Sequence, residues 1–246
     1  MGEIITQHLP SLLIGQYPSG PLGGLVLTLI LSMLGLGLAF PLSIALALCR
    51  VSPFAILRVP STVVVYFVRG VPLVLLVFWS YFLVPGLIGH SVSAFTTLVV
   101  TLVIYQATYM SEIVRAGMEA LPRGQTEAAR SLGLSYGKTM QQIVLPQALY
   151  NMLPSLISQF VSTIKETSIG YVISVHELTY SAHQVNSDLL TKPLQVFATL
   201  SVVYFIVCFA LTQCAHAVDR RITRRRAGAT TPAIERTAHD PLFQGQ

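Results

Sequence analysis

A row of polar side chains recurs at helical spacing through one otherwise apolar stretch, residues 147–166. Side chains three and four positions apart lie on the same face of a helix, so the row forms one polar stripe. Lipid cannot satisfy amides and charges, so the stripe must face other helices or a water-filled path. Hydrogen bonding between helices alone is the alternative; we favour a path for a polar solute. The stripe consists of Asn151, Ser155, Ser158, Gln159, Ser162, Lys165 and Glu166.

The next four residues, Thr167-Ser168-Ile169-Gly170, have the pattern of a helix cap followed by a new helix start. A helix that restarts inside a membrane directs free backbone N–H groups and its positive dipole end into the cavity. The carboxylate of an amino acid suits that end. We therefore expect Thr167 and Ser168 near such a carboxylate, with Lys165 and Glu166 contacting other charged or polar groups of the solute.

Residues 95–115 repeat the polar pattern more weakly and are a candidate second wall of the same path. The polar side chains there are again at helical spacing. They are Thr101, Tyr105, Thr108, Tyr109 and Glu112.

Other kinds of chemistry find no support in the residue spacing. The histidines, including His176 and His183, show no metal-type pairing on one helix face, and the cysteines show no paired spacing. No nucleophile lies at a suitable spacing from a base. The segment 133–139 resembles a phosphate-binding loop, but its first glycine is one residue too close to the Gly-Lys pair. We expect this chain to bind no metal, nucleotide or other cofactor.

The composition places most of the chain in a membrane. Of 246 residues, 53% are hydrophobic and 10% are charged, which is more apolar surface than one soluble domain of ordinary composition can bury. A membrane-spanning helix needs about 20 mostly apolar residues, and long stretches here carry no charge. We predict an all-α polytopic membrane protein with five transmembrane helices. The predicted spans are 21–48, 70–84, 95–115, 147–164 and 194–218.

Small residues recur at every fourth position of the first predicted span. Such a stripe lets another helix approach closely. The stripe is Gly35, Ala39, Ser43 and Ala47.

Positive charges gather after the first, third and fifth predicted spans, whereas the opposite loops carry little more than Lys165 and Lys192. The positive-inside tendency places the N-terminus outside and the C-terminus in the cytoplasm. No cationic segment precedes the first apolar run, so we expect no cleaved signal peptide. The expected parts are an extracytoplasmic segment at 1–20, a transmembrane domain at 21–220, and a basic, disordered cytoplasmic tail at 221–246. The basic run in that tail is expected to contact anionic lipid rather than nucleic acid.

A motif with many fixed positions lies between the third and fourth predicted spans. It reads Glu127-Ala128-Ala129-Arg130-Ser131-Leu132-Gly133, followed after nine residues by Ile143 and then by Leu145-Pro146. A good helix start at Thr126-Glu127-Ala128-Ala129 and a helix end at Gly133 predict a compact polar helix. The motif resembles the coupling loop, here about 120–146, of permease subunits of binding-protein-dependent ATP-binding-cassette importers. By that resemblance Glu127, Ala128, Ala129, Ser131, Leu132 and Gly133 dock on the ATPase.

Further markers resemble the polar amino acid branch of these permeases, from about residue 21 to residue 226. They lie in the segments 69–73, 111–117, 124–125, 145–148, 165–168 and 177–178, and the structural positions among them are Arg69, Gly70, Pro72, Glu112 and Arg115. The resemblance implies a MetI-like five-helix permease fold, a second permease that is identical or homologous, and an extracytoplasmic amino-acid-binding protein. It also implies an ATPase dimer that holds ATP and magnesium. Residues 78–86 look most like glutamate/aspartate permeases.

The predicted function is import of a polar amino acid by alternating access, across the bacterial inner membrane, by a chain that is not itself an enzyme. An ion-coupled secondary transporter or channel that works without an ATPase is the alternative, because five spans with one polar-faced helix permit it. A membrane scaffold without transport leaves the polar stripe unexplained.

Overall fold

The computed structural model describes residues 2–229, and these are almost wholly helical. The first half contains α1 (Gly2–Ile14), α2 (Gly24–Val51), α3 (Ala55–Gly70), α4 (Leu73–Ile88) and α5 (Ala94–Glu119). Two short helices follow, α6 (Arg123–Ser131) and α7 (Tyr136–Thr139), and a π-helical turn, η1 (Met140–Val144), leads into α8 (Leu145–Glu166). A 3₁₀ segment, η2 (Thr167–Ile173), then precedes α9 (Leu178–Leu189) and the long α10 (Pro193–Ala229).

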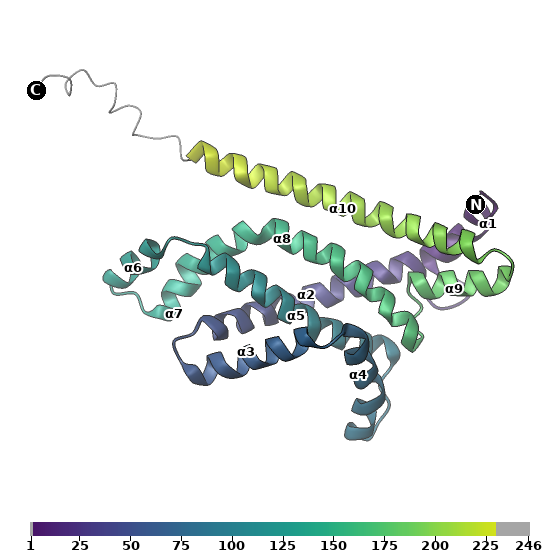
Figure 1. The fold of residues 1–246 in the computed structure, drawn as a ribbon, viewed down its shortest axis with the longest axis horizontal. Coiled ribbons are helices and arrows are strands. Elements are labelled where there is room, and N and C mark those ends of the chain that lie inside the picture. Colours follow the sequence, from purple (N-terminus) through teal and green to yellow (C-terminus); the bar gives the residue numbers. More distant parts are fainter. Residues whose placement is uncertain (1, 230–246) are drawn as a thin grey trace, which may run out of the picture.

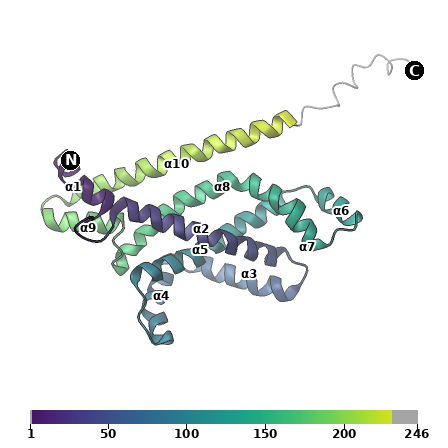
Figure 2. The same ribbon diagram turned by 180° about the vertical axis from the view of Figure 1, so that it is seen from behind.

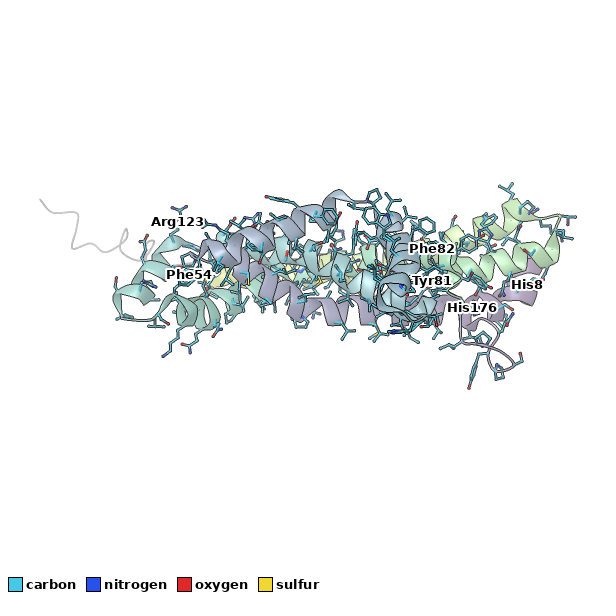
Figure 3. The ribbon with its side chains drawn as sticks, turned by 90° about the horizontal axis from the view of Figure 1, so that it is seen from below. His8, Phe54, Tyr81, Phe82, Arg123 and His176 are labelled. Carbon is cyan, nitrogen blue, oxygen red and sulfur yellow. The ribbon has the colours of Figure 1, made fainter. Side chains whose placement is uncertain are left out.

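The long helices run back and forth along one axis of an elongated molecule. The N-terminus, α1 and α9 gather at one end, and α6 and α7 lie at the other end, toward which α10 points (Figure 1). Figure 2 shows α2 between these two ends, with α3 returning beside it. In Figure 3, His8 and His176 mark the end with α1 and α9, and Arg123 and Phe54 mark the end with α6 and α7.

Helices α2, α5 and α10 are each long and apolar enough to cross a membrane. The consecutive helices α3 and α4 qualify together as a fourth span, although they are bent by 102° at their junction. The helix α8 has 22 residues, long enough to cross, but its polar stripe makes it less apolar than α2, α5 and α10. Length and composition therefore support three spans or four, and the predicted count of five is not reached on these grounds.

Close packing of α2 against α5 forms the centre of the fold. The predicted small-residue stripe of α2 is entirely buried, and a Cβ at Gly35 would lie 3.3 Å from Leu102 Cβ on α5. Leu31, Leu98 and Leu102 are fully buried in the same contact. Small side chains on α2 therefore let the two backbones approach, as the sequence indicates.

Three features of the structure differ from the sequence-based boundaries. The helix α3 occupies residues between the first two predicted spans, and it includes Pro60 in its second turn. The helix α9 forms before the last span. Helix α10 continues through residue 229, so residues 221–229 extend the helix, while residues 230–246 lie outside the described part. The predicted disorder of the tail stays a prediction.

Candidate functional site: a charged cluster and a polar path inside the helices

Glu112 on α5 gathers three arginines from three helices. Its Oε2 accepts a hydrogen bond from Arg50 Nη1 of α2 and lies 3.7 Å from Arg69 Nη1 of α3. Its Oε1 lies 2.6 Å from Arg115 Nη2, one turn further along α5. The Arg50 side chain is 4% exposed, so its charge depends on this carboxylate. The cluster ties α2, α3 and α5 together and joins the predicted positions Arg69, Glu112 and Arg115.

Two tyrosines extend this cluster along α5. The Arg69 guanidinium lies over the Tyr109 ring, 4.9 Å from its centroid, which is a favourable cation–π distance. The Tyr105 hydroxyl donates to the Tyr109 hydroxyl at 3.1 Å. Tyr105, Tyr109 and Glu112 therefore do lie on one face, as the spacing of residues 95–115 predicts.

A buried amide, Gln106, links α5 to the polar stripe of α8. Its Nε2 donates to Glu166 Oε2, and its Oε1 accepts from Gln159 Nε2 at 2.6 Å. Gln106 is fully buried, so both ends of its amide need these partners. The bridge fixes the direction of the Glu166 carboxylate.

The polar stripe of α8 lines three open cavities in succession. The first, of about 570 Å³, is bordered by Asn151 and Ser155, and the second, of about 500 Å³, by Ser155, Gln159 and Ser162. The third, of about 510 Å³, lies between α8 and the start of α4. Its polar lining is Ser162, Lys165, Glu166 and Ser168, and its apolar lining includes Pro72, Leu73, Val74 and Ile169.

The residues after Glu166 depart from the expected helix break. Thr167 continues from α8 without interruption, and its backbone N–H donates to Thr163 O and Lys165 O. Its side chain is fully buried and donates to Ile164 O at 2.8 Å. No backbone N–H end is thus freed at Thr167, because the helix tightens to 3₁₀ instead of ending. The restart comes later, at Glu177, whose carboxylate caps α9 by accepting from Thr179 N and Tyr180 N.

The predicted coupling segment forms an exposed helix at one end of the molecule, α6 (Figure 1). Ala129 is buried at 4% exposure and seats the helix, while Leu132 is 81% exposed. The side chains of Glu127, Ala128 and Ser131 are exposed too. Gly133 follows with φ +87°, and its N–H donates to Arg130 O, so it ends the helix in the left-handed conformation that glycine adopts readily.

Two hydrogen bonds join this end to the long helices. Gln147 Nε2 of α8 donates to Gln125 Oε1 of α6 at 2.8 Å. The Tyr136 hydroxyl of α7 donates to Val51 O at the end of α2 at 2.7 Å. Burial raises the pKa of this phenol, so it stays a donor through the ordinary pH range. These bonds link α6 to α8 and α7 to α2.

Two residues of this site were missed by the sequence reasoning. Arg50 was interpreted only as an orienting charge after the first span, and Gln106 was passed over between Tyr105 and Thr108. The sequence does indicate that Gln106 has a polar partner, because an amide in an apolar span is costly without one. The partner itself, on a helix 60 positions later, could not be read from the sequence.

Together these features define a class: a helical membrane protein with charged and polar side chains along an interior path and an exposed polar helix at one end, as in a transport permease. The family described as "binding-protein-dependent transport system inner membrane component" matches residues 37–224. The chain belongs to this family. Its members are transport components and not enzymes, so the predicted family and fold class are confirmed.

Similar proteins are permeases of ATP-binding-cassette (ABC) transporters. The chain is 35% identical over 208 residues to the inner membrane amino-acid ABC transporter permease protein YhdY of Escherichia coli (strain K12). The matched region spans 83% of this chain and 57% of that protein. It is 33% identical over 202 residues to the probable glutamine ABC transporter permease protein GlnP of Bacillus subtilis (strain 168). This match spans 81% of this chain and 92% of that protein. A crystal structure of an amino acid ABC transporter with histidines has a TM-score of 0.74 and 30% identity, over 80% of this chain and 92% of that one.

Proposed function

We propose that this chain is the permease subunit of an ATP-driven importer that carries a polar amino acid across the bacterial inner membrane. The observation that carries the proposal is the exposed helix α6. Its Ala129 is buried against the rest of the protein, whereas Glu127, Ala128 and the following Leu132 are exposed. An exposed apolar side chain such as Leu132 beside a carboxylate suits a protein contact. The family match supports an ATPase as the protein in that contact.

The partners follow from this function. An ATPase dimer that binds ATP and magnesium docks on Glu127–Gly133, a second permease of the same or a homologous sequence completes the membrane part, and an extracytoplasmic binding protein delivers the amino acid. ATP binding closes the ATPase dimer, α6 moves, and the bond between Gln125 and Gln147 passes the motion to α8. The permease cores then alternate between outward and inward access.

The third cavity of α8 is the proposed solute site. It presents one ammonium, from Lys165, and one carboxylate, from Glu166, with the hydroxyls of Ser162 and Ser168 nearby. This arrangement complements a zwitterion, because an amino acid brings one carboxylate and one ammonium of its own. Asn151, Ser155 and Gln159 continue the path through the two neighbouring cavities. Thr167 supports the helix from its buried position and touches no cavity described here.

Glutamate or aspartate is the solute that residues 78–86 favour, and it remains the finer part of the proposal. Relatives are named for other amino acids, glutamine among them. A competition assay with unlabelled amino acids against labelled glutamate decides the matter. Stronger competition by glutamine or histidine than by aspartate would remove the acidic assignment and leave the importer intact.

The test of coupling is Glu127→Pro in the complete transporter in reconstituted vesicles. Proline inside the first turns of α6 removes a backbone donor and disrupts the docking helix, whereas the membrane helices are untouched. We expect ATP-dependent accumulation to fall to background while insertion is normal. The control is Ser61→Ala, outside the docking segment, because the Ser61 hydroxyl bonds only to Leu57 O of its own helix. Normal uptake by the proline variant contradicts the coupling role.

The competing function, an ion-coupled transporter, makes the opposite prediction for the ATPase. Vesicles that hold this chain and its membrane partner without ATPase should accumulate no amino acid under an ion gradient. Accumulation under those conditions would replace the proposed function with the ion-coupled one.

A further inference from the structure

A separate cavity lies at the end of the molecule opposite α6, between α1, η2 and α9. Its volume is about 420 Å³, and its lining includes Ser11 and Gln16 near α1, Tyr171 of η2, and Tyr180, His183 and Asp188 of α9. His8 and His176 mark this end in Figure 3. In the proposed orientation this end faces outward, where the amino acid arrives. The inference below rests on the proposed function for that orientation.

Aromatic rings form one wall of this cavity. Tyr171 and His183 stack with their centroids 4.0 Å apart, and Tyr171 and Tyr180 lie 6.4 Å apart at 55°. The His176 ring also contacts Tyr180, with the centroids 4.4 Å apart and the rings tilted at 34°. Tyrosine faces attract cations, and rings held by neighbours lose little freedom when a cation binds.

The charge in the cavity is negative. Asp188 is exposed to it, and among residues 8–222, whose side chains the structure describes, no cation forms an ion pair with this carboxylate. Asp188 lies in the last turn of α9, which ends at Leu189. A helix C-terminus adds partial negative charge from its unpaired carbonyl groups, so the carboxylate and the helix end both attract a cation to this position.

The remaining lining suits a small polar ligand. Gln16, Gln184 and Ser187 supply amide and hydroxyl groups around Asp188, and the cavity is open to solvent. A volume of this size admits an amino acid together with water. No tyrosine lines the three cavities along α8.

We propose that this cavity binds the α-ammonium group of the amino acid at the outer mouth of the permease, before the solute reaches Lys165 and Glu166. Asp188 supplies the opposite charge, and the faces of Tyr171 and Tyr180 flank the ammonium. The cavity thus holds the solute near the path while the inner site is closed, and it raises the local concentration of amino acids with a free ammonium group.

The test is protection of a cysteine at the rim of the cavity. Ser187→Cys is introduced after Cys49, Cys208 and Cys214 are replaced by alanine, and the complete transporter in lipid nanodiscs is alkylated with a membrane-impermeant maleimide. The probes are glutamine methyl ester, which keeps the ammonium, and N-acetylglutamine, which lacks it. We expect the methyl ester to slow alkylation about threefold, as for a site two-thirds occupied, and N-acetylglutamine to have no effect.

Substitutions of Asp188 test whether its negative charge causes the protection. Asp188→Asn should abolish protection, and Asp188→Glu should restore it, so a loss caused by misfolding would be distinguished. Glu166→Gln should keep protection, because Glu166 lines a different cavity, and the assay needs neither ATP nor transport. A failure here therefore leaves the proposed import function standing. The proposal is overturned if both probes protect equally. It is also overturned if neither probe protects and only the extracytoplasmic binding protein does.

Discussion

At the scale of single residues, Glu112 is the point where α2, α3 and α5 meet. One carboxylate serves Arg50, Arg69 and Arg115, and the most buried of these, Arg50, has no other carboxylate within ion-pair distance in the described chain. A buried guanidinium that loses its partner costs more free energy than the pair contributes when it is intact. The cluster therefore holds the helices in one arrangement.

Glu112→Gln should destabilise the folded protein by about 3 kcal/mol, because the amide cannot neutralise the buried Arg50. The measurement is the thermal unfolding midpoint in detergent. The matched control is Glu119→Gln, which removes a carboxylate from the same Arg115 at a side chain that is 56% exposed. An exposed pair contributes less than about 1 kcal/mol, so equal shifts for the two variants would refute the role of burial.

Gln106 directs the carboxylate of the proposed solute site. Gln106→Leu leaves Gln159 and Glu166 without their amide partner at a fully buried position, which costs on the order of 1–3 kcal/mol. We expect KM for the amino acid to rise by about tenfold, since 1.4 kcal/mol corresponds to that factor. Steady-state uptake by vesicles measures it.

Thr108→Val is the control for Gln106, because the buried Thr108 hydroxyl bonds only to Tyr105 O of its own helix. Its KM should stay within about twofold of the unsubstituted protein, since no interhelical partner is lost. An unchanged KM for Gln106→Leu would mean that the Glu166 carboxylate does not depend on Gln106.

At the scale of elements, α6 depends on how it ends. Gly133 has φ +87°, and its missing Cβ would meet open space, so only backbone strain opposes a larger residue there. A residue with a Cβ in this conformation costs roughly 1–2 kcal/mol. The end of α6 sets the position of Leu132, the most exposed apolar side chain of the docking segment.

Gly133→Ala should loosen the C-terminal end of α6 and lower ATP-dependent uptake to about a tenth, by the same free-energy relation. Hydrogen exchange of the α6 amides should accelerate in parallel. Gly137→Ala is the control, because Gly137 also faces open space but lies within α7 and has no positive φ. Slower uptake in both variants would point to a general effect of lost glycine and not to the end of α6.

At the scale of the whole molecule, the two ends carry different chemistry. One end presents α6 and the basic end of α10, and the other presents α1, α9 and the cavity with Asp188 (Figure 1). The proposed orientation, based on the positive-inside tendency, places the first end in the cytoplasm. Both proposed steps, coupling to the ATPase and capture of the amino acid, require this assignment.

Labelling of intact cells tests the orientation. Ser19→Cys, just after α1, should react with a membrane-impermeant maleimide, and Ser131→Cys, in α6, should react only after the cells are permeabilised. Both serines are exposed in the structure, so accessibility within the protein does not distinguish them. Reaction of Ser131→Cys in intact cells would reverse the orientation and with it the direction of transport.

The sequence by itself determined the features that depend on local spacing. The polar stripe of α8 follows from the three-and-four periodicity of a helix, and the small residues of α2 from a period of four. The end of α6 at Gly133 follows from the freedom of glycine at positive φ. The family was legible for the same reason, since its motif lies in one continuous segment, 127–146.

Only the tertiary structure decided which distant residues meet. Arg50 reaches Glu112 across 62 positions, and Gln106 reaches Glu166 across 60, through the packing of whole helices. The same packing turned the expected helix break after Glu166 into a 3₁₀ continuation, because the buried Thr167 keeps its backbone and hydroxyl bonds within the helix. The local sequence determines where a helix can end, and burial against neighbouring helices determines where it does end.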